Sequence, residues 1–149
     1  MTSREIVNLL QKLVKQGQPR EKLLREAVYL IHQSSPKFDW TGVYELQGQE
    51  LVLGPFYGKA TEHTRIPVGR GVCGTAVAEA RNLNVPDVTK TENYLACSLE
   101  TRSELVVLIR RGEKIYGQID IDSHTPNAFG PNEESRVQAV ADLLATLYE

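Results

Sequence analysis

The sequence predicts an α+β fold, in which N- and C-terminal helices pack on one face of an antiparallel sheet and leave the other face free for a ligand pocket. Three observations predict it. Helical apolar spacing fills residues 1–36, two pairs of strand-like segments occupy the middle of the chain, and helical spacing returns after residue 130. The 149 residues contain no repeat or linker, so a single domain spanning 1–149 is expected.

Two helices are expected in the N-terminal third of the chain. Gly17 and Pro19 separate their apolar patterns, and Pro36 ends the second one. Spacings of three and four residues are typical of an amphipathic helix. The residues that carry them are Ile6, Leu9, Leu10 and Leu13, then Leu23, Leu24, Ala27, Val28 and Ile31.

The middle of the chain predicts two β-hairpins. Residues 41–46 and 50–54 flank a turn at 47–49, and the apolar run 105–109 is followed by an alternating strand at 114–122. Short apolar runs bounded by glycine-containing turns are typical of hairpins. A short helix is expected between them, near residues 76–80.

The last helix is expected to begin after Gly130. Pro131 suits the first helical position, and Glu133 and Glu134 complement the positive end of the helix. Its apolar residues are Val137, Val140, Ala141, Leu144 and Leu147. The longest stretch without periodicity, residues 87–102, is expected to be a functional loop.

The overall composition excludes several classes of protein. A net charge of −2 gives no electrostatic reason to expect nucleic acid or an anionic membrane as a partner. The chain has no apolar run of the roughly 20 residues that a membrane span needs, and its start lacks the apolar core of a secretory signal. We therefore expect a cytoplasmic protein. No cofactor is expected, and no metal, because no CxxC or paired-histidine spacing occurs.

The two cysteines of the chain lie in local sequences suited to chemistry. Cys73 lies in the glycine-rich segment 69–76, in a turn ahead of the expected short helix, where helix-terminal amides favour a thiolate. Cys97 lies in the aperiodic segment, which suits either an accessible nucleophile or a buried inert thiol. If the two thiols meet, the chain is a redox protein. If they do not, it is a ligand-binding module.

Three carboxylates are candidates for one cluster. Asp120 and Asp122 share a strand face by the two-residue period of a strand. A three-residue turn at 111–113 puts Glu104 opposite Asp120 on that face, whereas a two-residue turn puts it opposite Ile119 and facing the other way. In the first register, crowded carboxylates raise at least one pKa, supply a proton donor and attract a ligand ammonium group. The alternative is a solvated polar face.

Aromatic and histidine side chains complete the set of candidates. Trp40 and Tyr44 lie four residues apart on one strand, where they form either an aromatic wall for a small apolar group such as a methyl or part of the core. His63 and His124 could serve as bases, but no Cys/His or Ser/His/Asp spacing singles them out.

These residues resemble a known family, the free methionine-(R)-sulfoxide reductases, which are small stand-alone GAF-domain enzymes. The resemblance runs in order from about Trp40 to Phe129, and ordinary GAF domains lack this combination of motifs. It implies a GAF-like sheet and reduction of the R epimer of free, not protein-bound, methionine sulfoxide. The matching stretches are residues 40–44, 51–58, 65–76, 96–97, 103–107 and 117–123.

The resemblance also implies a role for each candidate residue. Cys97 matches the cysteine that attacks the sulfoxide sulfur. Glu104, Asp120 and Asp122 match the carboxylates that bind the substrate and protonate its oxygen. Trp40 and Tyr44 match the aromatic wall around the methyl end of the substrate.

The chain departs from the family pattern in the loop around Cys97, at Ser98, Glu100 and Arg102, and more consequentially at His63. His63 stands where a third cysteine, usually the resolving thiol, is typical. The resemblance then leaves Cys73 or an external thiol to resolve Cys97 through a disulfide, with thioredoxin or a small thiol as reductant, and it is compatible with a homodimer. Two alternatives stay open: a GAF binding module that has lost turnover, and a redox sensor that uses Cys97.

Overall fold

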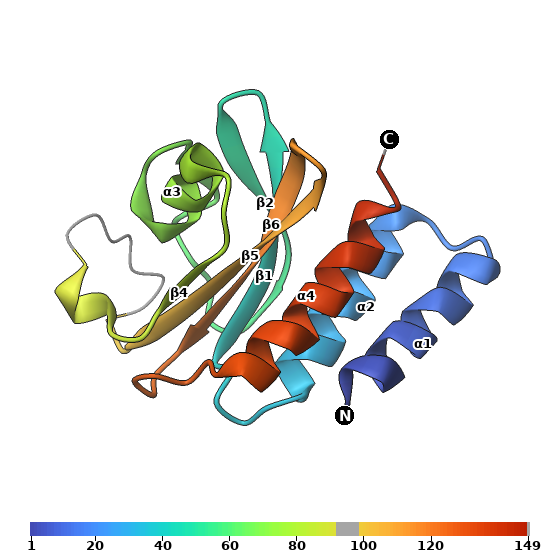
Figure 1. Ribbon diagram of the computed structural model, residues 1–149, viewed down its shortest axis with the longest axis horizontal. Helices are drawn as coiled ribbons and strands as arrows, with labels where there is room; N and C mark the ends of the chain where they lie inside the picture. The colour runs from blue at the N-terminus through green and yellow to red at the C-terminus, as the bar shows by residue number, and fades with distance from the viewer. Residues whose placement is uncertain (92–98, 149) are drawn as a thin grey trace.

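A computed structural model describes residues 1–91 and 99–148 (Figure 1). One antiparallel sheet of six strands has the spatial order β3-β2-β1-β6-β5-β4, and α1, α2 and α4 lie on the opposite side of it from α3. The predicted α+β class is confirmed. The strands are β1 (Trp40–Gln47), β2 (Glu50–Tyr57), β3 (Arg65–Pro67), β4 (Leu83–Val85), β5 (Ser103–Arg111) and β6 (Lys114–Ser123).

The helices of the two termini form two layers on their face of the sheet. α2 (Arg20–Gln33) and α4 (Pro131–Ala145) pack on the strands, and α1 (Ser3–Lys15) packs on both of these helices. Leu9 of the predicted α1 stripe is 42% exposed, because only one side of α1 has a neighbour. Thr2 and Glu5 form a capping box at the start of α1, which satisfies two helix-terminal N–H groups. None of the described helices is long and apolar enough to cross a membrane.

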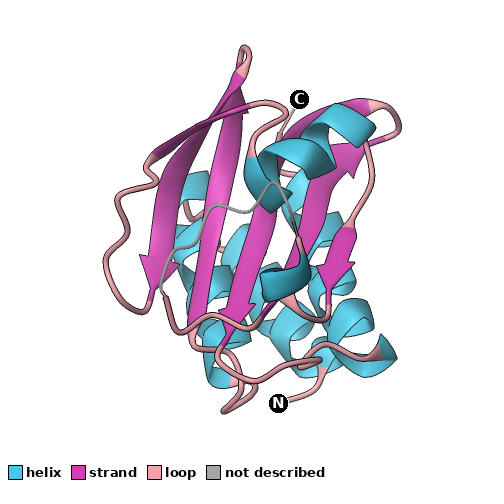
Figure 2. Cartoon of the chain, turned by 90° about the vertical axis from the view of Figure 1, so that its left-hand side faces the viewer, coloured by secondary structure: helices cyan, strands magenta, loops and turns pink. Residues whose placement is uncertain are grey.

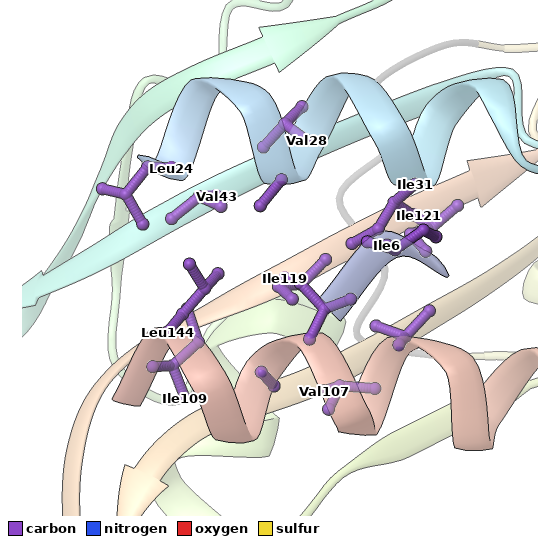
Figure 3. Close-up of a cluster of buried hydrophobic side chains, with 14 of the residues drawn as sticks. Ile6, Leu24, Val28, Ile31, Val43, Val107, Ile109, Ile119, Ile121 and Leu144 are labelled. Atoms are coloured by element: carbon purple, nitrogen blue, oxygen red, sulfur yellow. The ribbon is translucent and has the colours of Figure 1, made fainter. Parts of the chain in front are cut away.

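The main hydrophobic core lies between the sheet and these helices (Figure 3). Alternate residues of β5 and β6, such as Val107 and Ile119, point into it and meet Val28 of α2 and Leu144 of α4. Because successive side chains of a strand point to opposite faces, the residues between them, such as Asp120 and Asp122, lie on the other face of the sheet.

α3 (Gly71–Glu79) lies in front of that opposite face (Figure 2). It begins about five residues earlier than the sequence predicted, so Cys73 lies in its first turn and not in a turn ahead of it. Gly69 and Gly71 have positive φ angles of +95° and +67°, which glycine adopts without steric cost. They allow the chain to turn from β3 into α3 within a few residues. The edge strands β3 and β4 have three residues each, too few for a two-residue alternation to be recognised.

The register of the β5–β6 hairpin matches neither of the two considered from the sequence. Arg111 pairs with Lys114, so the turn has two residues, and Glu104 pairs with Asp122, not with Asp120. A bulge lies where Ile109 pairs with Gly117 while Arg110 pairs with Ile115. A two-residue turn alone would turn Glu104 away from the face of Asp120 and Asp122. The extra residue of the bulge shifts the register by one more position, so Glu104 lies on that face after all.

The bulge also changes the predicted alternation of β6. Residues 117–122 point to the sides expected from the sequence, but Ile115 and Tyr116 each point to the side expected for the other. Tyr116 faces the terminal helices and stacks on Tyr148 with ring centroids 4.9 Å apart, whereas Ile115 packs with the smaller cluster under α3. The extra residue at the bulge is Tyr116, which explains the exchange.

We expect Gly117→Ala to destabilise the fold by about 1–3 kcal/mol, the range for overpacking a close contact. A Cβ at this position would lie 2.3 Å from the backbone oxygen of Tyr44 and 3.1 Å from Cα of Glu45, and neither backbone atom can move alone. Urea unfolding monitored by circular dichroism measures the loss. Gly54→Ala is a suitable control, because this strand glycine has no positive φ and a Cβ there would lie 3.3 Å from the backbone oxygen of Val43, about 1 Å farther than the contact at Gly117. Equal effects of both variants would contradict a packing cause.

Candidate functional site

The face of the sheet beneath α3 gathers the candidate residues from β1, β5 and β6. Trp40 pairs with Asp122 on one side of β6, and Glu104 pairs with Asp122 on its other side. Directly paired residues point to the same face. Asp120 follows on β6 opposite Gly42. The three carboxylates therefore lie on one face, as predicted, although Glu104 has the other aspartate as its direct partner.

The carboxylates are almost completely removed from solvent. Glu104, Asp120 and Asp122 are 3%, 0% and 2% exposed. Burial, with the neighbouring charges of Asp120 and Asp122, raises the pKa of Glu104 well above its ordinary value. Burial also raises the pKa of Asp120, partly offset by hydrogen bonding with Glu104 and Cys73. Burial and mutual repulsion therefore favour a protonated carboxyl in this cluster, and Glu104 is the residue that carries the proton.

These raised pKa values predict how stability depends on pH. A carboxyl whose folded pKa exceeds its unfolded pKa binds its proton more tightly in the folded chain, so stability is greatest below the unfolded pKa and falls as pH rises toward the folded pKa. We expect Glu104→Gln, which cannot ionise, to melt above wild type at pH 8 and to lose this advantage as pH falls toward 4. Thermal melts across this range test it. A constant difference would contradict the assignment of the raised pKa to Glu104.

Cys73 belongs to this cluster. Its Sγ donates a hydrogen bond to Oε2 of Glu104 at 3.7 Å, and its residue is 5% exposed. The sulfur and one oxygen each of Glu104 and Asp120 all lie within 4.8 Å of one another. The contact of a thiol with the proton-holding carboxyl was not predicted, because it joins α3 to β5 across a packing interface. Cys97 lies outside the described residues, so the meeting of the two thiols stays a prediction.

The aromatic residues line the same face. The rings of Trp40 and Tyr44 have centroids 6.3 Å apart, and Phe56 of β2 stacks on Trp40 at 5.7 Å. Trp40 Nε1 donates to the carbonyl of Lys59 at 3.0 Å. A Cβ on Gly42 would lie 2.4 Å from the indole ring, so this glycine makes room for Trp40 over β1. The pair is packed in the smaller core and also borders the carboxylates.

Two cavities flank the cluster. One, of about 10 Å³, is lined by residues that include Tyr44, His63, Cys73, Glu104 and Asp120. That volume holds about one water molecule, so a pocket for a whole amino acid stays a prediction. The other, of about 210 Å³, is lined by Asp39, Trp40, Lys59, Glu100, Thr101, Asp122 and His124. A larger groove between α4 and β4, of about 500 Å³, has neither a thiol nor an aromatic ring among its described lining residues.

The two candidate histidines lie at different cavities. His63 lines the small one, and its carbonyl accepts a hydrogen bond from the Tyr44 hydroxyl at 2.7 Å. His124 lies at the larger one, with Nδ1 3.7 Å from carboxylate oxygens of both Asp39 and Glu100. A role for either as a base stays a prediction.

Comparisons with known proteins identify the family of this chain. The GAF domain model matches residues 19–147. The free methionine-R-sulfoxide reductase of Escherichia coli (strain K12) is 39% identical over 118 residues, which cover 79% of this chain and 69% of that protein. The chain belongs to the free methionine-R-sulfoxide reductase family of GAF domains.

Solved structures place the chain in the same family of oxidoreductases. The type II free methionine-R-sulfoxide reductase of Thermoplasma acidophilum is 37% identical with a TM-score of 0.83, covering 86% of this chain and 91% of that one. The Neisseria meningitidis reductase, solved in complex with its substrate, is 30% identical with a TM-score of 0.88, covering 97% and 87%. The family resemblance stated from the motifs is confirmed.

Two further residues at this face were not singled out from the sequence as candidates. Gln118 shares the face of Asp120 and Asp122 by the two-residue period, and its side chain is completely buried. That period could have marked it as a site residue. Phe56, in contrast, reaches Trp40 from the neighbouring strand β2, a contact for which the local sequence contains no signal.

Proposed function

We propose that this chain reduces free L-methionine-(R)-sulfoxide to methionine, with Cys97 as the nucleophile. The observation that carries the proposal is the buried carboxylate cluster, in which Glu104 retains a proton beside a thiol and an aromatic wall. Reduction of a sulfoxide needs a proton for the departing oxygen, and a domain that only binds a ligand has no use for one. The substrate bound by the Neisseria meningitidis relative supports the choice of substrate.

The residues divide the work of binding by their chemistry. Asp120 and Asp122 attract the ammonium group of a free amino acid, because a buried cation beside buried carboxylates relieves their mutual repulsion. Trp40 and Tyr44 contact the methyl end of the substrate. A peptide-bound methionine sulfoxide has no free ammonium group, so this arrangement selects the free amino acid.

In the first half of the reaction, the Cys97 thiolate attacks the sulfoxide sulfur while Glu104 protonates the oxygen. The attack joins the two sulfurs, and the protonated oxygen then moves as a hydroxyl group from the substrate sulfur to Cys97 Sγ. The sulfur–oxygen bond of the substrate and the new sulfur–sulfur bond both break, which releases methionine and leaves Cys97 as a sulfenic acid. Methionine leaves reduced by two electrons, and Cys97 is oxidised by two. One thiol and one sulfoxide therefore give one sulfenic acid and one thioether.

In the second half, a thiol condenses with the sulfenic acid to form a disulfide and releases water. Cys73 is the internal candidate, because it is the other cysteine of the chain and lies at the carboxylate cluster, and an external thiol is the alternative. Thioredoxin or a small thiol then reduces the disulfide by exchange. No cofactor takes part in this scheme.

A coupled assay with thioredoxin, thioredoxin reductase and NADPH tests the proposal. We expect NADPH consumption with the free R epimer, and only background rates with the free S epimer or with an acetylated R sulfoxide that lacks the ammonium group. No turnover of the R epimer with thioredoxin, glutathione or dithiothreitol would overturn it. In that case the second candidate, a GAF binding or redox-sensing module, would account for His63 at the position of the third cysteine, and calorimetry would show ligand binding without turnover.

A further inference from the structure

We propose that Gln118 is a positioning residue, whose side-chain amide holds the first turn of α3 on the sheet and thereby keeps the Cys73 thiol at the carboxylate cluster. Its Nε2 donates a hydrogen bond to the main-chain carbonyl of Cys73 at 3.0 Å. Because a carbonyl only accepts, the nitrogen of the amide must be the atom that faces it.

The surroundings of Gln118 are those of an apolar side chain. Tyr44 pairs with it from β1 and Leu108 from β5, and both belong to the buried cluster beneath α3. Gln118 is 0% exposed, and its Oε1 has no hydrogen-bond partner within the described residues. Burying an unsatisfied amide oxygen is unfavourable, so packing alone favours a leucine or methionine. The bond to Cys73 is the feature that an apolar residue could not supply.

Cys73 is thus held from two strands at once. Gln118 of β6 binds its carbonyl at 3.0 Å, and Glu104 of β5 accepts from its sulfur at 3.7 Å. A helical carbonyl has a second lone pair beyond the one used within the helix, so this contact adds to the helical hydrogen bonding. With the main chain held on one side and the thiol on the other, the sulfur has little freedom to leave Asp120 and Glu104.

A single-cysteine variant tests the positioning directly and does not depend on the proposed reaction. In Cys97→Ser, Cys73 is the remaining cysteine of the two. The rate at which a maleimide alkylates it reports how often the first turn of α3 opens and exposes the thiol. We expect Gln118→Met to react about fivefold to tenfold faster, the change that loss of one buried hydrogen bond produces. Gln118→Leu is a second variant of different shape and should behave alike. Alkylation at the rate of the Gln118 parent would overturn the proposal.

A kinetic measurement, which rests on the proposed resolving role of Cys73, separates positioning from general packing. With excess free sulfoxide and no reductant, quenched samples give the rates of methionine release and of Cys73–Cys97 disulfide formation. We expect Gln118→Met to slow disulfide formation about fivefold to tenfold relative to methionine release, while its melting temperature stays equal or rises. An unchanged ratio of the two rates would overturn the positioning role.

Asn84→Leu is the matched control. It removes an amide-to-carbonyl hydrogen bond from Asn84 Nδ2 to Phe129 at 2.7 Å, together with the bond of the same nitrogen to Glu134 at 2.8 Å. Both bonds lie away from the cysteine, so the variant should affect stability but neither thiol reactivity nor the ratio of rates. If Asn84→Leu changed the alkylation rate and the ratio of rates as much as Gln118→Met does, general loosening of the packing would explain the result and the positioning role would be wrong. Wild type that releases no methionine contradicts the proposed function instead, and the alkylation result then still decides the role of Gln118.

Discussion

Cys97→Ser is expected to reduce turnover of free methionine-R-sulfoxide to background, because a serine hydroxyl is not ionised at neutral pH and forms no sulfenic acid. Cys73→Ser is expected to release about one methionine per chain without reductant and then to stop, since the first half-reaction does not need the resolving thiol. Rapid quenching followed by chromatography of methionine measures both outcomes.

The fate of the oxidised Cys73→Ser chain identifies the resolving thiol. Steady turnover with glutathione, together with a glutathione adduct at Cys97, would assign resolution to an external thiol. Recovery with thioredoxin in wild type but not in Cys73→Ser would assign it to Cys73. A strong residual rate in Cys97→Ser would contradict the choice of nucleophile and leave Cys73, which touches Glu104, as the remaining thiol.

Glu104→Gln is expected to lower kcat by about 10² to 10³, within the range that a positioned general acid contributes. The amide keeps the shape and burial of the side chain but has no acidic proton to give to the sulfoxide oxygen. Burial and the neighbouring aspartates raise the pKa of the wild-type carboxyl, so its proton is retained toward neutral pH and kcat should fall as pH rises and Glu104 ionises.

Glu50→Gln is a suitable control for this variant, because Glu50 pairs with Arg65 at the surface, with 2.7 Å between Oε1 and Nη1. It should keep the wild-type kcat and the wild-type pH profile. If Glu104→Gln kept the wild-type kcat, proton donation would have to come from another group. If it raised KM alone, Glu104 would act in binding rather than as the acid.

Much of the fold could be predicted from the sequence because its signals are local. The helical stripes of α2 and α4 and the apolar run of β5 each lie within one element, and periodicity reads one element at a time. Two-residue alternation likewise placed Asp120 and Asp122 on one face, which the register with Trp40 and Gly42 confirms.

The remaining features depend on contacts between elements. Glu104 shares the face of Asp122 through a two-residue turn combined with a bulge, and not through the three-residue turn on which the predicted cluster depended. The bonds from Cys73 to Glu104 and from Gln118 to Cys73 join residues 31 and 45 positions apart. Such contacts follow from how α3 packs on the sheet, which no window along the chain contains.

Because of the bulge at Tyr116, the side of the sheet that Glu104 faces depends on whether the number of residues in this hairpin is odd or even. Removal of one residue between Ile109 and Gly117 would exchange the two faces of β5, turning Glu104 toward the terminal helices and Leu105 toward the thiol, whereas removal of two would not. Single-residue insertions and deletions should therefore be absent from active relatives at this tip, although the turn itself is exposed. The number of residues in an exposed turn, which lines neither cavity beside the carboxylates, would then decide whether Glu104 faces Cys73.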